Sequence, residues 1–242
     1  MKLKRYYYQG EIKSNQTIII DGEEFHHMIN VMRSSVGENI IVFNGDGNDY
    51  FCKIKQINKK FAEVYVEKCE KNHNTPSIDI TLYQAVCKGE KLSLIAQKIT
   101  ELGAKNMVVF HSKFTDIKDK TNKIDKLEKV SISASKQCGR SDILSVNGVI
   151  DFKEMAKSAV KHQKVFVAYE NAEGKTLYDA LQENNSYDDV ALIIGAEGGF
   201  SDDEISYLKD NNCEIVSLGK RILRTETASI AGIAQIIFAC EK

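Results

Sequence analysis

Two glycine-containing loops near the C-terminal end of the chain have the composition of a ligand site. The segment LIIGAEGGFSDDE covers residues 192–204, and SLGKRILRTETAS covers residues 217–229. In both, a short apolar run ends at glycine, a loop with charged residues follows, and a helix is predicted to begin. Ser201 followed three residues later by Glu204 is a capping box that marks the first helix start. Because glycine lets the backbone approach a bound molecule, the two loops side by side would form one site, although either alone is also typical of an ordinary strand-to-helix turn.

Arginine is scarce in this chain, which makes its positions informative. Of the 33 Lys and Arg residues only five are arginine, at positions 5, 33, 140, 221 and 224. A guanidinium is planar, always charged and able to make two parallel hydrogen bonds to a phosphate, a carboxylate or a base edge, which an ammonium cannot do. We therefore predict functional contacts above all for Arg140, Arg221 and Arg224.

Composition and missing motifs exclude several classes of protein. The 242 residues, 43% of them hydrophobic, suffice for one large or two small domains with a full core. No apolar run approaches the ~20 residues of a membrane span, and the charged N-terminus lacks the apolar part of a signal peptide, so we expect a soluble cytoplasmic protein without a membrane partner. The six cysteines form no CxxC pair and no His/Cys cluster, which argues against a structural metal. A net charge of -1 argues against attachment to nucleic acid by charge alone but permits a local basic face.

Motifs of other enzyme classes are missing from the sequence. It contains no dinucleotide-binding glycine motif after the first strand, no P-loop, no evident Ser/His/Asp constellation and no HExxH. Hydrolase and kinase functions are therefore unsupported.

The order of the predicted elements divides the chain in two. Residues 1–72 are β-rich, with strands predicted at 17–21, 38–43, 49–57 and 60–68, the turn NGDG between the second and third strands, and one helix at 23–32. This pattern predicts a small barrel with one helix. The polar segment EKNHNTPS contains the only proline, Pro76, and is the predicted linker, with a domain boundary near residue 73.

From residue 78 onward strands and helices alternate. Strands are predicted at 78–86, 107–111, 165–169, 190–194 and 214–218, and helices at 91–102, near residues 130, 156, 179 and 205, and at 227–240. Such alternation predicts an α/β fold with a mostly parallel sheet covered on both faces. The last helix is apolar nearly all round, so we expect it to be buried on every side, either within the chain or partly at a subunit interface.

Several stretches of the chain resemble one known family. GAEGGFSDDEI and LGKRILRTETA are similar to the paired C-terminal signatures of the RsmE family, S-adenosylmethionine-dependent methyltransferases of small-subunit ribosomal RNA in the knotted SPOUT superfamily. The second signature matches almost residue for residue, whereas the first has Ala196 where the family usually has proline. HHMINVMRSSVGENIIVFNGDG resembles the family's N-terminal pattern. KGEKLSLIAQKITELG and SASKQCGRSDI resemble two internal blocks, the latter with Lys136 in place of the usual glutamate.

This resemblance implies a fold and a cofactor. A PUA-like RNA-binding β-barrel would occupy residues 1–72, and an α/β methyltransferase domain with a C-terminal trefoil knot would occupy residues 73–242. The chain would form a homodimer with active sites at the interface. S-adenosylmethionine would be held by the loops 194–199 and 218–223, and the matching positions are Ile194, Gly195, Glu197, Gly198, Gly199, Leu218, Gly219, Ile222, Leu223 and Thr225.

The resemblance also implies methylation at N3 of a uridine in 16S ribosomal RNA of the small subunit. Loss of the N3 proton leaves a negative charge on the base. We hypothesise that Arg221 or Arg224, or Arg140 of the partner subunit, stabilises this charge, and that Glu226 orients one of these arginines. Structural ion pairs, Arg224 with Glu226 or Arg221 with Glu197, are the competing interpretation. RNA contacts would come from Arg5, Arg33, Lys88, Lys91, Gln137 and Arg140.

Two alternatives stay open at this point. Because glycine-loop cofactor sites do not encode the acceptor, the methyl group could go to another RNA position such as a ribose 2′-hydroxyl. The chain could also be a catalytically silent RNA-binding assembly factor that has kept the cofactor fold. Cofactor affinity separates the silent factor from either enzyme, and the modified nucleoside separates the two enzymes.

Overall fold

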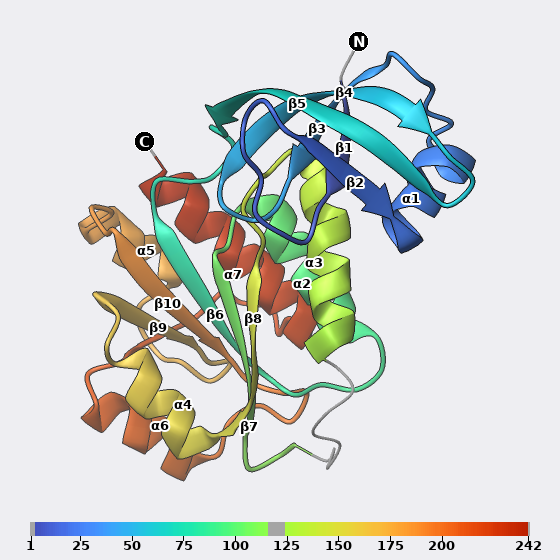
Figure 1. The fold of residues 1–242 in the computed structure, drawn as a ribbon. Coiled ribbons are helices and arrows are strands. Elements are labelled where there is room, and N and C mark those ends of the chain that lie inside the picture. Colours follow the sequence, from blue (N-terminus) through green and yellow to red (C-terminus); the bar gives the residue numbers. More distant parts are fainter. Residues whose placement is uncertain (1–2, 116–123, 242) are drawn as a thin grey trace. The chain divides into compact units, whose positions relative to one another are not determined.

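The computed structural model describes residues 3–115 and 124–241, which form two compact units (Figure 1). The N-terminal unit comprises residues 1–75 together with residues 135–143, and the C-terminal unit comprises residues 76–134 and 144–242. Residues 135–143 belong to the N-terminal unit although they follow part of the C-terminal unit in the sequence. The local sequence pattern does not predict this, because it depends on contacts between segments far apart in the chain.

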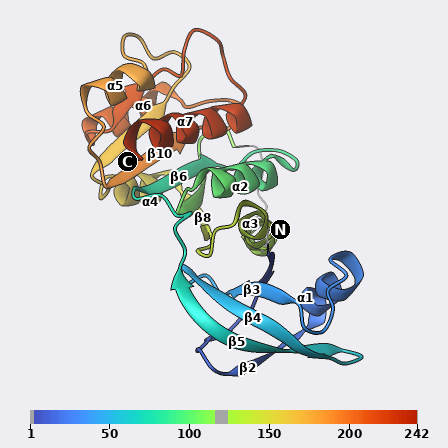
Figure 2. The same cartoon turned by 90° about the horizontal axis from the view of Figure 1, so that it is seen from above.

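The N-terminal unit is built on a curled mixed sheet, a half-barrel. Its strands are β1 (Lys4–Tyr7), β2 (Thr17–Asp21), β3 (Asn39–Phe43), β4 (Asn48–Ile57) and β5 (Phe61–Lys71). The strand order is β1-β3-β4-β5-β2, and only β1 and β3 run parallel (Figure 2). The predicted helix at 23–32 is present as α1 (Gly22–His26) followed by a π-helical turn, His27–Val31. Strand β1 was not predicted, because its parallel pairing with β3 leaves no hairpin signal in the sequence.

The C-terminal unit contains the predicted parallel sheet. Its strands are β6 (Asp79–Ala85), β7 (Asn106–His111), β8 (Ser145–Asp151), β9 (Lys164–Ala168), β10 (Asp189–Ile194) and β11 (Glu214–Val216), in the order β11-β9-β10-β6-β7-β8. All of the neighbouring pairs are parallel. Strand β8 escaped prediction because it is a half-exposed edge strand of polar composition.

Helices cover both faces of this sheet. They are α2 (Lys91–Leu102), α3 (Ile124–Cys138), α4 (Phe152–Ala159), α5 (Leu177–Glu183), α6 (Asp202–Asp210) and α7 (Thr225–Cys240). Along β10 the side chains alternate between two cores: Leu192 packs in the core formed with α2, α5 and α7, and Ile193 in the core formed with α4 and α6. A strand buried on both faces is apolar at successive positions, which is why β10 reads VALII after its partly buried first residue, Asp189.

Helix α7 lies against the sheet and beside α2 (Figure 2). Its Gly232 allows the close approach, since a Cβ there would lie 2.6 Å from Leu192 Cδ2. Ile233 and Ile236 are fully buried, but the Phe238 side chain is 92% exposed. The alternative that α7 is buried wholly within the chain is therefore wrong, because the sheet and α2 cover one stripe of the helix and leave the stripe with Phe238 open. Burial of this open stripe at a subunit interface stays a prediction. The trefoil knot implied by the resemblance stays a prediction.

The structure also bears on membrane association and on the cysteines. No helix within residues 3–115 and 124–241 is both long enough and apolar enough to span a membrane. Four of the six cysteines are buried, Cys69 is exposed and Cys138 is partly exposed.

Candidate functional site

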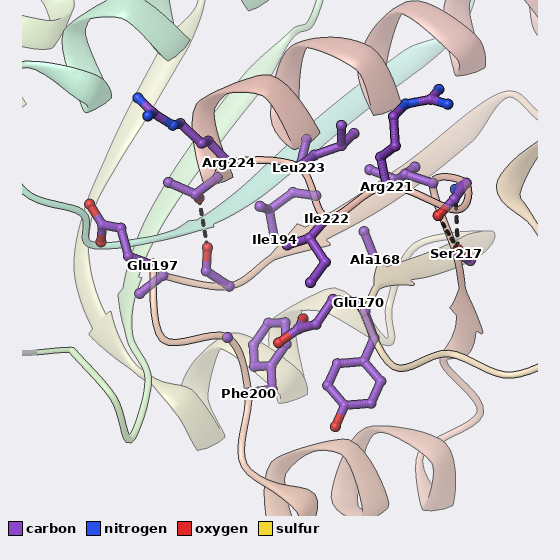
Figure 3. Close-up of a pocket in the computed structure, with 18 of the residues that line it drawn as sticks. Ala168, Glu170, Ile194, Glu197, Phe200, Ser217, Arg221, Ile222, Leu223 and Arg224 are labelled. Atoms are coloured by element: carbon purple, nitrogen blue, oxygen red, sulfur yellow. Dashed lines mark hydrogen bonds between the residues drawn. The ribbon is translucent and has the colours of Figure 1, made fainter.

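A pocket of about 360 Å³ opens where β9, β10 and β11 end, and the loops that follow these strands line it (Figure 3). Ligands of open α/β sheets bind outside the carboxyl ends of the strands, and the volume lies in the range of about 300–1,000 Å³ common to small-molecule sites. Of the ten residues predicted to bind a cofactor, all except Gly198 line it: Ile194, Gly195, Glu197, Gly199, Leu218, Gly219, Ile222, Leu223 and Thr225.

The first loop follows β10 and turns sharply at its glycines. The Gly199 N–H donates to the Ala196 carbonyl at 3.0 Å, which closes a turn. Gly199 has a φ of +69°, a left-handed conformation that favours glycine, and a Cβ there would lie 2.3 Å from Glu170 Oε1, so the end of that side chain would have to move. Directly after the turn, the Ser201 N–H donates to Glu204 Oε2 at 2.9 Å and the Glu204 N–H donates to Ser201 Oγ at 3.4 Å. The predicted capping box at the start of α6 is confirmed.

The second loop joins β11 to α7 and is fastened to the first. The Gly219 N–H donates to Ser217 Oγ at 3.1 Å, which shapes the start of this loop. At its other end Thr225 opens α7, and its hydroxyl donates to the Gly195 carbonyl at 2.7 Å. This bond, drawn as a dashed line in Figure 3, joins the two loops that the sequence predicted to share one site.

The chemistry of the lining fits S-adenosylmethionine. Apolar side chains from both loops and from β9 form the walls, which suits an adenine ring. Glu170 also faces the pocket, and the structure gives its carboxylate no hydrogen bond or ion pair with any described residue. A free carboxylate can accept from ribose hydroxyls or balance the positive charge of a sulfonium or an ammonium. The pocket therefore offers the apolar walls and the polar group that this cofactor needs.

Arg221 and Arg224 lie at the rim of the pocket with exposed side chains. Figure 3 shows their guanidinium groups pointing away from each other, outward from the cavity. Neither guanidinium has an ion pair with a residue that the structure describes. Both cations are thus available to a further negatively charged group.

The expected pairing of Glu226 or Glu197 with an arginine is wrong, because both carboxylates form ion pairs with Lys91 instead. Lys91 Nζ lies 2.8 Å from Glu197 Oε1 and 3.6 Å from Glu226 Oε2. The hydrogen bond to Glu197 raises the pKa of Lys91 above its usual value. Burial alone would raise the pKa of Glu197, but the hydrogen bonds from Lys91 Nζ and from the Lys88 N–H hold that pKa below its ordinary value.

One carboxylate oxygen of Glu226, beside Lys91, lacks a hydrogen bond to any residue that the structure describes. Its Oε2 atom is buried and has no hydrogen-bond partner among the described residues, and the ammonium of Lys91 is its charged neighbour. Lys91 was predicted to contact RNA phosphate, yet it is half-buried between the two carboxylates. Lys88, predicted for the same role, has an exposed side chain.

Two arginines predicted to contact RNA or the reacting base are buried in the N-terminal unit instead. The Arg140 side chain is 2% exposed and forms an ion pair with Asp142. Arg5 donates to Asp49 Oδ1 at 2.8 Å and to Ser141 Oγ at 2.5 Å. These findings correct the predictions for Arg5 and Arg140, because both guanidinium groups are almost fully buried and already paired with carboxylates of the same unit.

The remaining predicted RNA contacts of the N-terminal unit are at its surface. Gln137 lies in the last turn of α3 and is exposed. Arg33 is also exposed and directly follows the π-helical turn and Met32, with a φ of +50° that is unusual for a residue other than glycine.

Sequence reasoning missed part of the pocket. Ala168 at the end of β9 and Tyr169 and Glu170 just after it line the pocket, and Phe200 and Ser217 flank the two predicted loops. The usable signal was positional, since the loop after β9 leaves the same edge of the sheet as the glycine loops. The loop after β9 has no glycine cluster, so its sequence alone did not predict a ligand contact.

Two family models match the chain. The model of an RNA methyltransferase domain matches residues 73–237, and the model of an RNA methyltransferase PUA domain matches residues 20–67. Among relatives, the ribosomal RNA small subunit methyltransferase E of Bacillus subtilis is 30% identical over 99% of this chain and 98% of its own length. The protein of the same name from Rickettsia conorii is 29% identical over 98% of this chain and 96% of its own length.

Solved structures agree with this match. A Legionella pneumophila structure, described as a methyltransferase with the bound cofactor SAM, superposes with a TM-score of 0.91 at 30% identity and covers 100% of both chains. The ribosomal RNA small subunit methyltransferase E of Neisseria gonorrhoeae, bound to S-adenosyl methionine, has a TM-score of 0.89 at 26% identity and covers 99% of this chain and 98% of its own. Because a methyltransferase model matches most of the chain and the similarity runs over nearly all of its length, the chain belongs to the ribosomal RNA small subunit methyltransferase E family, RsmE.

Proposed function

We propose that this protein uses S-adenosylmethionine to methylate N3 of a uridine in 16S ribosomal RNA. The observation that carries this proposal is the pocket at the ends of β9, β10 and β11, in which the two signature loops meet. The relatives named as ribosomal RNA small subunit methyltransferases support the choice of RNA, and the solved relatives that hold S-adenosylmethionine support the choice of cofactor.

The two loops and β9 would hold the cofactor. Backbone groups of 194–199 and 218–223 would bind the adenosine, and the apolar walls would exclude water. Glu170 would accept a hydrogen bond or balance positive charge. When bound, S-adenosylmethionine supplies a methyl group activated by its sulfonium.

The residues of the rim act on the acceptor base. Uracil N3 carries a proton that must leave before or during methylation, and the resulting negative charge spreads onto O2 and O4. Arg221 and Arg224 are exposed and without ion pairs in the described part of the chain, so they are free to stabilise this charge. Fixed cations act most strongly where water is excluded.

The RNA itself would be held by both parts of the chain. In this proposal, residues 1–72 form an RNA-binding domain and residues 73–242 form the catalytic domain. Arg33, Gln137 and Lys88 have exposed side chains suited to phosphate or sugar contacts. The protein would act in the cytoplasm on the small ribosomal subunit.

We also propose a homodimer that covers the open stripe of α7. Phe238 is 92% exposed, and Ala234 and Ala231, one and two turns before it, are small and only partly buried. A flat apolar stripe of this kind is typical of a helix-to-helix contact between subunits.

The dimer is tested by the molar mass in solution. Light scattering should give twice the chain mass of 27.2 kDa for the unaltered protein and a single chain mass for Phe238→Asp. The control Ile19→Asp changes another exposed apolar residue, 44% exposed on β2, and should leave the dimer intact. A Phe238→Asp protein that keeps the double mass would contradict this interface.

The function is tested with purified protein, labelled S-adenosylmethionine and small ribosomal subunits that lack the modification. After digestion, mass spectrometry identifies the labelled nucleoside, and we expect 3-methyluridine. Label in another nucleoside, including a 2′-O-methylated one, would replace the N3 assignment. No label and no cofactor binding would favour a catalytically silent RNA-binding factor.

A further inference from the structure

Gln84 is a buried polar residue that lies just outside the pocket. It belongs to β6, in the middle of the parallel sheet of the C-terminal unit, and its exposed fraction is 0%. A polar amide in such a position is costly unless its donor and acceptor atoms are both hydrogen-bonded. The lining of the pocket does not include Gln84, and neither signature loop contains it.

The amide of Gln84 bonds to both loops of the site. Gln84 Nε2 donates to Thr225 Oγ1 at 3.0 Å, and Thr225 Oγ1 in turn donates to the Gly195 carbonyl at 2.7 Å. On its other side, Gln84 Oε1 accepts from Ser229 Oγ at 2.5 Å. Thr225 and Ser229 lie one turn apart at the start of α7. The Gln84 side chain is therefore hydrogen-bonded to the beginning of this helix and, through Thr225, to the first loop.

Glutamine is well matched to this position. Its amide is a donor on one atom and an acceptor on the other. The Thr225 hydroxyl gives its own proton to the Gly195 carbonyl and so accepts from Gln84. The Ser229 hydroxyl has two acceptors for its proton, Gln84 Oε1 and the Thr225 carbonyl at 2.9 Å. An ionised glutamate could not donate to Thr225, and methionine would fill the space without the donor N–H and without the acceptor oxygen of the amide. Hydrogen bonds in a chain also strengthen one another inside a low-dielectric core.

We propose that Gln84 is a positioning residue for the cofactor site, which fixes the loops 194–199 and 218–225 relative to each other before the cofactor binds. This inference rests on the proposed function, because it takes the pocket to bind S-adenosylmethionine. Loops that are already in place lose less conformational freedom on binding, so the affinity rises. Without Gln84 the pocket keeps all its lining residues but not their fixed arrangement.

The test measures the dissociation constant of S-adenosylmethionine by calorimetry, without RNA and without turnover. We expect Gln84→Met to weaken binding by roughly tenfold or more, the effect of losing one or more buried hydrogen bonds. The matched control is Asn106→Leu, which removes another side-chain amide that donates to a threonine hydroxyl, Thr81 Oγ1, at 3.1 Å on the same sheet. The control should lose stability but keep its affinity within about twofold.

A set of conservative changes separates positioning from general destabilisation. Thr225→Ser keeps the relaying hydroxyl and should retain most of the affinity, whereas Thr225→Val should weaken binding as much as Gln84→Met does. The double variant should then be little worse than either single one, because both break the same chain of hydrogen bonds. Fully additive losses would overturn the inference.

Two further results keep the proposal testable if Gln84→Met does not fold. Ser229→Ala removes one partner of Gln84 and should weaken binding by a few-fold, with faster hydrogen exchange of the amides in 194–199 and 224–229 in the cofactor-free protein. Unchanged affinity and unchanged exchange would overturn the role of Gln84 while leaving the proposed function standing. If the unaltered protein bound no S-adenosylmethionine, the proposed function and this inference would both fail.

Discussion

Two pairs of arginines in this chain occupy opposite environments. In the N-terminal unit, Arg5 and Arg140 are 8% and 2% exposed and pair with Asp49 and Asp142. In the C-terminal unit, Arg221 and Arg224 are exposed at the rim of the pocket and form no ion pair with the residues that the structure describes. The same rare residue therefore serves as an internal connector in one unit and as a free cation in the other.

The scarcity of arginine indicates where a guanidinium is needed, but it does not indicate which group the guanidinium contacts. A planar, permanently charged group is needed in both places, which explains why lysine did not replace it. Whether that group meets a carboxylate of the same chain or a ligand depends on burial, and burial is a property of the folded unit. Arg5 shows the first case, since its guanidinium also donates to the Arg140 carbonyl at 3.0 Å and so holds residues 135–143 against β1.

The largest expected effect is on stability, from Arg140→Met. This change leaves the half-buried carboxylate of Asp142 without its cation, and broken buried pairs cost about 3–5 kcal/mol. Urea unfolding should show a loss of that order in the free energy of unfolding, whereas Arg224→Met should change it by less than ~0.5 kcal/mol. Equal effects at the two positions would remove the distinction between the buried and the exposed pair.

The second effect is on turnover, from Arg221→Met and Arg224→Met. If each guanidinium stabilises charge on the base, turnover should fall by roughly 10²-fold, the scale found for one preorganised electrostatic group. Affinity for S-adenosylmethionine should stay within about threefold, and Arg→Lys should restore part of the rate. Full activity in both methionine variants would show that these arginines do not act on the acceptor.

The third effect is the acid sensitivity of the buried pairs. Burial alone would raise the pKa of Asp49 and of Asp142, but their bonds to Arg5 and to Arg140 hold both pKa values below the ordinary 3.8. A lowered folded pKa gives stability that is complete above pH 3.8 and is lost as the pH falls through the folded value. Unfolding at a series of pH values should show a decline on the order of 1–3 kcal/mol below about pH 4. Arg140→Met should lack the share of that decline that Asp142 contributes.

The smallest effect comes from Lys91→Met at the rim. The pair with Glu197 is about one-third exposed, so solvent screening limits its contribution to about 0.5–1 kcal/mol. Because the pKa of Glu197 is lowered from 4.5 and that of Lys91 is raised from 10.5, the pair stabilises the fold between those two pH values. The difference in unfolding free energy between Lys91→Met and the unaltered protein should therefore be largest near neutral pH and vanish in acid. A difference that does not shrink as the pH falls below 4.5, the ordinary pKa of Glu197, would mean that packing, not charge, is lost.

Local pattern predicted much of the fold. The apolar stripe that ends at Gly103 predicted the helix at 91–102, which matches α2 residue for residue, and the strand at 17–21 matches β2. The resemblance of the two C-terminal signatures to RsmE is confirmed by the family models and by relatives along the whole chain. The four-residue strand β1 and the half-exposed edge strand β8 were missed because such strands are defined by their neighbours more than by their own sequence.

The site could be predicted only in part. Glycines and the capping box lie within a few residues of each other, so their spacing alone brought out the two loops that line the pocket. Glu170 and Gln84 stayed hidden, because each gains its place from a strand distant in sequence from the loops. The proposed pairing of Glu226 with an arginine failed for the same reason, since Lys91 reaches Glu226 from the start of α2.

The sequence by itself determined most of the elements, the two loops and the family, because periodicity, turn chemistry and motifs are encoded within short stretches. Only the tertiary structure decided which charged groups are free. Arg140 is neutralised by Asp142, whereas Arg221 forms no ion pair with any residue that the structure describes, although both come from stretches that resemble one family. The physical reason is that an ion pair or a buried hydrogen bond requires two groups within a few ångströms, and the folding of the whole unit selects which groups meet.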